Sequence, residues 1–133
     1  MKKISKLVKE LDKWFSLFIR LRESEDGITK CFTCGKQDHY KKLQNGHFQS
    51  RKHYSTRWNE KNCQVQCVAC NMFNQGEQYR FAIALDYKYG SGSAAELEAL
   101  ARTTTKFMRS DYMENISYYK KAVNNFLDEN YIE

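Results

Sequence analysis

Two Cys-x-x-Cys pairs restrict what this chain can fold into more than any other feature of its sequence. Cys31 and Cys34 form the first pair, in "CFTC", and Cys67 and Cys70 form the second, in "CVAC". Pairs at this spacing can bind one Zn²⁺ through four thiolates in tetrahedral geometry. The 32 residues between the pairs must then fold back on themselves. We therefore predict one structural zinc per chain.

The predicted zinc is structural because four thiolates leave no open position for water. In a domain this small, metal binding contributes directly to folding. The fifth cysteine, Cys63, is expected to be a buried small apolar residue rather than a reactive thiol. The basic start of the chain, "MKKISKLVKELDKW", contains too many charges for a signal peptide. We therefore expect a cytoplasmic protein, in which disulfides are rare.

The length of the chain favours one compact domain. Its 133 residues include no proline and only six glycines, and 41% of them are hydrophobic, so a real core is expected and long structureless linkers are not. No apolar run is long enough to span a membrane, so we expect no membrane partner. We predict a mostly helical α+β domain in three parts: an N-terminal amphipathic helix in residues 1–27, a zinc-stabilised core in 28–90 and a helical region in 91–133.

Hydrophobic spacing predicts where the first helix lies. Apolar residues recur at three- and four-residue intervals over residues 3–25, and Gly27 follows as a natural end. Between the cysteine pairs the helical period disappears. There we predict a β-hairpin around residues 43–50 and a basic loop, and a helix should follow Cys70.

Glycines and polar residues mark the remaining helix ends. The helix after the second cysteine pair is expected to be divided at Gly76 and to end at Gly90. "SAAE" matches a capping box, with Ser93 as the N-cap and Glu96 at the third helical position. A short helix should follow it, and a final amphipathic helix should begin near Asp111.

Basic residues are concentrated between the cysteine pairs. The formal net charge of the chain is +6, and residues 36–61 carry seven basic side chains and two acidic ones. Such a segment favours a polyanion as partner, most simply nucleic acid. A solvated basic face explains this charge equally well, so the charge alone leaves both interpretations open.

A histidine and two asparagines accompany the cysteine pairs. His47 lies in "GHF" between the pairs, Asn62 lies five residues before Cys67, and Asn71 directly follows Cys70. Three roles are open to His47: zinc ligand, packed core residue, or base in a hydrolytic reaction. Four cysteines make the first role unnecessary. Each asparagine could also simply cap a turn or a helix.

This arrangement resembles the HNH, or ββα-metal, nuclease superfamily, and its layout is similar to that of phage endonuclease VII. The stretches "LDKWFSLFIRLRESEDGITKCFTCGK", "LQNGHFQSR", "TRWNEKNCQVQC", "CN" and "YKYG" are more closely similar, in order and spacing, to the phage NinG (Rap) recombination endonuclease family. The likeness runs from the first helix to about Gly90 and is weaker beyond. It implies a ββα-metal core within residues 28–90, flanked by helices, in a protein of the host-cell cytoplasm.

The resemblance implies a metal-dependent DNA endonuclease of phage or prophage recombination, acting on branched DNA such as Holliday junctions and displacement loops. His47 would take a proton from the attacking water, and Asn62 would orient the His47 loop. Asn71 would offer its carbonyl oxygen to a catalytic Mg²⁺ or Mn²⁺. The alternative is a zinc-dependent DNA-binding module without catalysis. The first helix could also form a homodimer surface, which would suit two-fold symmetric junctions.

Five basic side chains are predicted DNA contacts. Arg51 and Arg57 carry guanidinium forks that suit phosphate, although Arg57 could instead pair with Glu60. The other three would add non-specific affinity that weakens with salt. These three are Lys41, Lys42 and Lys52.

One position departs from the superfamily pattern. Many HNH nucleases carry a metal-binding acid directly before the histidine, and here that residue is Gly46. Asn45, Glu60 and Glu77 are candidates to replace the acid, and spacing does not choose among them. The NinG likeness includes this "GH" form, so the departure leaves the ligand set of the catalytic metal open without indicating a dead enzyme.

Overall fold

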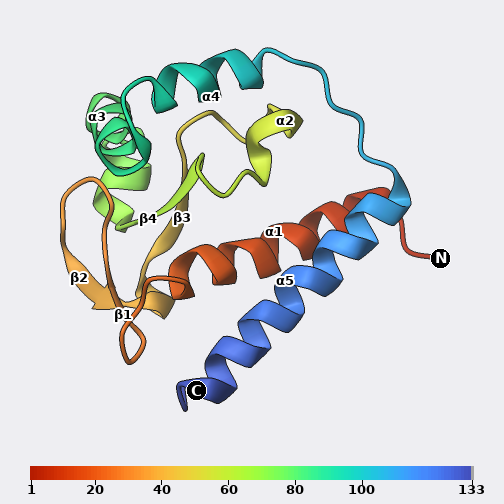
Figure 1. The fold of residues 1–133 in the computed structure, drawn as a ribbon. Coiled ribbons are helices and arrows are strands. Elements are labelled where there is room, and N and C mark those ends of the chain that lie inside the picture. The colour runs from red at the N-terminus through yellow and green to blue at the C-terminus, as the bar shows by residue number, and fades with distance from the viewer. Residues whose placement is uncertain (133) are drawn as a thin grey trace.

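The computed structural model describes residues 1–132, which form helices and two small sheets (Figure 1). The helices are α1 (Ile4–Leu21), α2 (Tyr54–Arg57), α3 (Gln78–Tyr89), α4 (Ser93–Ala101) and α5 (Arg109–Glu129). The strands are β1 (Ile28–Lys30), β2 (Gln37–His39), β3 (Gln44–His47) and β4 (Cys63–Gln66). A 3-10 turn spans Tyr40–Lys42, and a π-helical turn spans Ala69–Phe73. The predicted mixture of helices and small sheets is confirmed.

Helix α1 contacts both the long helix α5 and the strand pair β3–β4 (Figure 1). Its apolar stripe is buried against α5, and the rings of Phe15 and Tyr119 meet edge to face with centroids 4.9 Å apart. The buried residues of this cluster are Leu7, Val8, Leu11, Phe15, Ile19, Cys63, Tyr112, Ile116 and Tyr119. The predicted amphipathic face of the first helix is therefore a core face.

The first helix ends at Leu21, before the predicted limit at residue 25. The N–H and the hydroxyl of Ser24 both donate to the carbonyl of Leu21, and such local bonds compete with helix continuation. Asp26 and Gly27 then adopt φ angles of 51° and 80°. These left-handed residues turn the chain into β1.

Each sheet is an antiparallel pair of strands. β1 pairs with β2, and β3 pairs with β4 in a register that sets Gln44 opposite Gln66 and His47 opposite Cys63. The local hairpin predicted around residues 43–50 is therefore wrong. The partner of β3 is the strand that leads into the second cysteine pair, and the loop between the two strands carries α2.

Glycines divide and end the helices as predicted, but the capping box is wrong. Gly76 separates the π-helical turn from α3, and Gly90 caps α3 with a φ of 112°. Ser93 is the first residue of α4, and its hydroxyl donates to the carbonyl of Gly90. Asp86 of α3 takes over the capping role, because its carboxylate accepts the N–H of Ala94 at 2.8 Å.

The longest helix, α5, begins at Arg109, close to the predicted start at Asp111. The Asp111 carboxylate accepts the N–H of Met108 at 2.7 Å, which satisfies a free donor at the helix start. Over residues 1–132, no helix combines the length and the apolar character needed to cross a membrane.

Candidate metal centre and active-site pocket

The two cysteine pairs meet in space, as their spacing predicted. The sulfur atoms of Cys31, Cys34, Cys67 and Cys70 all lie within 4.8 Å of one another. The Sγ atoms of Cys34 and Cys67 are 3.7 Å apart. A tetrahedral zinc with bonds of about 2.3 Å requires sulfurs roughly 3.8 Å apart. The cluster could therefore hold one structural zinc, with all four positions filled by thiolates.

Backbone geometry prepares both pairs for a metal. Gly35 follows the first pair with a φ of 80°, and its N–H donates to the carbonyl of Cys31 at 2.9 Å. This left-handed conformation favours glycine. In the second pair, the N–H of Cys70 points at the sulfur of Cys67, 3.5 Å away. Backbone donors of this kind stabilise thiolate charge.

Cys63 is not part of the cluster. It is fully buried in the core beside α1, so its prediction as a buried residue is confirmed. Burial raises the pKa of its thiol far above the ordinary value. The thiol donates to the carbonyl of Arg57, 3.4 Å away. Cys63 is thus a protonated packing residue.

A pocket of about 500 Å³ opens between α1 and β3. It brings together three predicted site residues, which are His47, Arg51 and Asn71. The remaining lining residues are Asp12, Ser16, Arg20, Leu43, Gln44, Asn45 and Met72. This pocket is the candidate active site, because it gathers titratable, amide and cationic side chains in one concave surface.

His47 is held in one orientation inside this pocket. Its Nε2 atom lies 3.0 Å from the carbonyl oxygen of Arg57. A carbonyl can only accept, so Nε2 carries the proton and Nδ1 keeps its lone pair. Burial is the main cause that lowers the pKa of His47, to about 4. The ring is therefore neutral at pH 7, with Nδ1 able to accept a proton.

Asn62 fastens the loop that begins after His47. It is fully buried, and its Oδ1 accepts the N–H of Gln49 at 2.7 Å. Its amide nitrogen donates to the carbonyls of Gln49 and Thr56, at 3.1 Å and 3.0 Å. One side chain thus ties both arms of the loop together.

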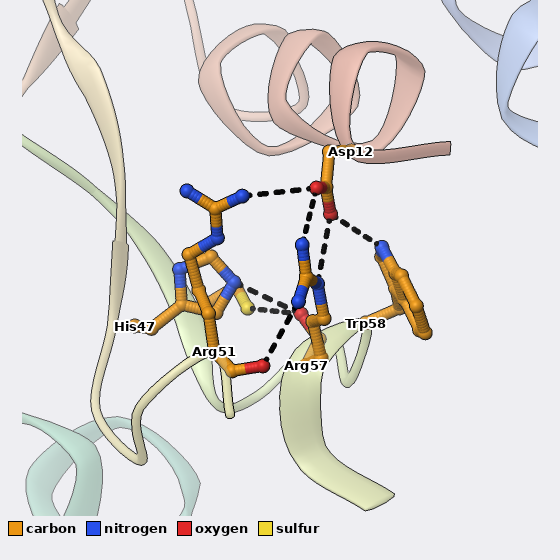
Figure 2. Close-up of polar contacts among 6 residues, drawn as sticks. Asp12, His47, Arg51, Arg57 and Trp58 are labelled. Atoms are coloured by element: carbon orange, nitrogen blue, oxygen red, sulfur yellow. Dashed lines mark hydrogen bonds and ion pairs between the residues drawn. The ribbon is translucent and has the colours of Figure 1, made fainter. Parts of the chain in front are cut away.

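Asp12 of α1 is the centre of a polar network at the edge of the pocket (Figure 2). Its Oδ2 accepts from the guanidinium groups of Arg57 at 2.6 Å and Arg51 at 3.0 Å. Its Oδ1 accepts from Nε of Arg57 at 3.1 Å and from the indole of Trp58 at 2.9 Å. The bond to Asp12 is the main cause that raises the pKa of Arg57. The alternative pairing of Arg57 with Glu60 is wrong.

Asn71 lies in the π-helical turn after the second cysteine pair. Its amide nitrogen donates to the side-chain oxygen of Gln44 on β3, 2.8 Å away. This bond uses the nitrogen and leaves the Asn71 carbonyl oxygen as the ligand atom. Amide oxygens are suitable ligands for hard cations such as Mg²⁺.

Residues 1–129 match the family model described as the bacteriophage lambda NinG protein. The chain belongs to the NinG family. No curated protein and no solved structure matches it. The family match covers α1 and β3 as well as the cysteine cluster, so both walls of the pocket lie within the matched residues.

In this NinG chain, a steric restriction explains why residue 46 is a glycine. A Cβ atom built on Gly46 would lie 1.9 Å from Oε1 and 2.6 Å from Cδ of Gln66. Gln66 is fully buried, and its amide nitrogen donates to the carbonyl of Gly76 at 2.9 Å and to the hydroxyl of Thr33 at 3.0 Å. An acid cannot stand directly before His47 unless this fixed side chain moves.

Of the three residues considered as replacements for that acid, only Asn45 lines the pocket. Glu60 accepts a hydrogen bond from the hydroxyl of Tyr119 at 2.9 Å, and Glu77 pairs with a nearby arginine of α3. The carboxylate that does line the pocket is that of Asp12. It comes from a helix far away in the sequence.

The predicted DNA-contact residues differ in their surroundings. The Arg51 side chain is 60% exposed and lines the pocket, whereas the Arg57 side chain is 12% exposed and bound to Asp12. Arg20, which was not predicted, also lines the pocket and donates to the carbonyl of Tyr40 at 3.0 Å. The three predicted lysines are exposed and lie outside the pocket lining. They are Lys41, Lys42 and Lys52.

Helix α1 supplies the wall of the pocket that sequence reasoning missed. Asp12, Ser16 and Arg20 follow one another at four-residue spacing, so they share one face of α1. That spacing is visible in the sequence. Polar residues on an amphipathic helix ordinarily face solvent, however, and only the packing of β3 against α1 turns this face into a pocket wall.

Proposed function

We propose that this NinG chain is a metal-dependent DNA endonuclease of the HNH type that acts on branched DNA, such as Holliday junctions, in phage recombination. One observation carries the proposal: a single pocket contains a neutral histidine with an unprotonated Nδ1, an asparagine carbonyl and an exposed arginine. The order β3, β4 and α3 around the cysteine cluster supports a ββα-metal core. The branched substrate rests on the family resemblance.

The proposed reaction is hydrolysis of a phosphodiester. A water molecule attacks phosphorus, and Nδ1 of His47 accepts the proton that the water loses. The new bond joins the water oxygen to phosphorus, and the bond from phosphorus to the 3′ oxygen breaks. The leaving oxygen then takes a proton from solvent. The bond from His47 Nε2 to the carbonyl of Arg57 keeps Nδ1 as the basic atom throughout.

The low pKa of His47 suits a base that must be neutral before the reaction. With a pKa of about 4, nearly all of the imidazole is neutral at pH 7. The scissile phosphate brings negative charge, which raises the pKa of a nearby imidazole. Substrate binding would therefore strengthen His47 as a base.

Asn71 would hold the catalytic Mg²⁺ or Mn²⁺ through its carbonyl oxygen, and the cation would neutralise charge developing on the phosphate. The chain's own contribution to phosphate binding would come mainly from Arg51, which is the exposed arginine of the pocket. The exposed lysines predicted above would add affinity that is independent of sequence. Arg57 is better suited to positioning, because Asp12 occupies its guanidinium group.

A cleavage assay with Mg²⁺ or Mn²⁺ on four-way junctions, linear duplex and supercoiled plasmid tests the proposal. His47→Ala should bind DNA normally but cut about 10²–10⁴ times more slowly. His53→Ala is the matched control, because His53 lies outside the pocket lining. Cutting by His47→Ala at the wild-type rate would remove His47 from the mechanism.

The alternative is a zinc-dependent DNA-binding module without catalysis. Zinc-loaded wild-type protein that binds four-way junctions but leaves every substrate intact would favour it.

We also propose that the chain acts as a homodimer on two-fold symmetric junctions. Light scattering should then give a protein mass near twice 15.8 kDa, and a protein that is monomeric both alone and on DNA would refute the dimer.

A further inference from the structure

We propose that Asp12 is the positioning residue of the pocket: it fixes the end of α2 so that the Arg57 carbonyl holds the Nε2–H of His47. The contacts between His47, Arg57 and Asp12 are shown in Figure 2. The catalytic consequence of this inference rests on the proposed function. The structural link between Asp12 and His47 does not, and it can be tested without DNA.

The contacts of Asp12 identify it as an anchor rather than a metal ligand. Its two oxygens accept four hydrogen bonds, two from Arg57 and one each from Arg51 and Trp58. A carboxylate has about four lone-pair sites, so all of them are engaged. A cation could bind only after one of these donors had left. Asp12 therefore does not replace the acid that is missing at Gly46.

The segment that Asp12 anchors has little stability of its own. Helix α2 contains only four residues, and a single helical turn is unstable in isolation. Asp12 accepts hydrogen bonds from Arg57, the last residue of α2, and from Trp58, the next residue. The carboxylate thus ties the end of α2 to the longer, well-packed helix α1.

The anchored residue is the one that holds His47. The carbonyl of Arg57 accepts from the Nε2–H of His47, and the guanidinium of the same residue is bound by Asp12. Arg57 also donates to the carbonyl of Arg51 at 3.1 Å, which closes the network around the loop. If the guanidinium group lost its partner, the carbonyl would keep the bond from the Cys63 thiol at 3.4 Å but lose its tie to α1, so it would hold the imidazole ring less firmly.

The negative charge of Asp12 distinguishes a positioning residue from a residue that binds DNA. Asp12 carries a negative charge at the rim of a pocket proposed to take a phosphate, and it holds the exposed Arg51 at 3.0 Å. Removal of a negative charge beside the pocket should leave DNA binding unchanged or make it tighter. Asp12 should therefore affect the rate of cleavage without supporting affinity.

The test is nitrogen-15 NMR of the histidine rings in zinc-loaded wild type and Asp12→Asn. The wild type should show a His47 Nε2–H resonance that exchanges slowly with solvent, because that proton is bonded and half-buried. Asp12→Asn should lose this resonance, while the ring signals of His39 stay in place. Glu10→Gln is the matched control, because Glu10 lies on α1 like Asp12 but forms an ion pair with Lys2 and does not contact the network.

Cleavage supplies the second measurement. Asp12→Asn should cut junctions about 10²-fold more slowly, the effect expected for misplacing a catalytic group by about 1 Å, with a dissociation constant for DNA no weaker than that of the wild type. Should Asp12→Asn fail to fold, Arg57→Lys carries the same test, since it replaces the guanidinium fork with a single ammonium.

The outcomes separate the two proposals. A folded variant that keeps the protected Nε2–H resonance overturns the positioning role. Loss of that resonance with an unchanged cleavage rate confirms the structural link but overturns its catalytic consequence. If the wild type cuts no DNA, the proposed function fails, and the NMR result still decides whether Asp12 positions His47.

Discussion

Substitution of Gly46 by alanine should destabilise the protein strongly, although the backbone there does not require glycine. Gly46 lies in β3 and has no left-handed φ. At such a position an alanine that fits would stabilise by about 0.4–1 kcal/mol, because it restricts the unfolded chain. The expected loss of stability therefore comes wholly from the side chain of Gln66.

The size of the loss follows from the contacts of Gln66. A Cβ on Gly46 would lie 1.9 Å, 2.6 Å and 2.8 Å from three atoms of that side chain, so a small shift cannot relieve the overlap. Displacing Gln66 breaks its bonds to Gly76 and Thr33, worth about 1 kcal/mol each. Overpacking costs about 1–3 kcal/mol more. We expect Gly46→Ala to lose about 3–5 kcal/mol of unfolding free energy, and Gly46→Asp to lose more.

Urea denaturation of zinc-loaded protein, followed by circular dichroism, measures this loss. A double-mutant cycle with Gln66→Ala provides the control. Once the Gln66 side chain has been shortened, Gly46→Ala should cost almost nothing. A loss below about 1 kcal/mol in the wild-type background, or an equal loss in both backgrounds, would refute the steric explanation of Gly46.

Three further predictions concern the metal, the histidine and the pocket arginine. Removing zinc with a chelator should lower the melting temperature by more than about 10 °C, and a chain that keeps its full stability without metal would contradict the role of the cysteine cluster. In the folded protein the pKa of His47 is about 4, below the unfolded value of 6.5. The stability that the neutral His47 ring contributes is therefore complete above about pH 6.5 and is lost as the pH falls towards 4. The loss should reach about 3 kcal/mol, and denaturation at about pH 7 and pH 4.5 should show a weaker pH dependence in His47→Gln. Arg51→Gln should reduce the salt dependence of DNA binding by about one phosphate contact and change stability by less than about 1 kcal/mol, because Arg57 keeps Asp12 paired. An unchanged salt dependence would exclude Arg51 as a phosphate contact.

Local rules predicted the parts of this fold that short stretches of sequence determine. The spacing within the cysteine pairs predicted a shared metal site, and their sulfur atoms do converge. The helical period placed α1, and Gly90 ended α3 because few other residues adopt its φ angle. These features depend on neighbours along the chain.

Features that depend on distant contacts could not be predicted. Pairing of β3 with β4 follows from the meeting of the cysteine pairs, and turn rules favoured a local hairpin instead. The sequence offered Glu60, three residues away, as an ion-pair partner for Arg57. In the structure the partner is Asp12, which is 45 residues away in the sequence. Nothing in the sequence near Asp12 distinguishes it from the other charged residues of an amphipathic helix.

The pairing of α1 with α5 has a consequence for how the protein is made. Helix α1 is synthesised before the helix that covers its apolar face, which spans residues 109–129. A nascent chain that ends before this segment already contains both cysteine pairs and His47. Its first helix can pack only against the strand pair β3–β4, so the wall that carries Asp12 is not yet held by α5. For the nuclease proposed above, this order of synthesis would delay assembly of the complete pocket until translation has passed α5.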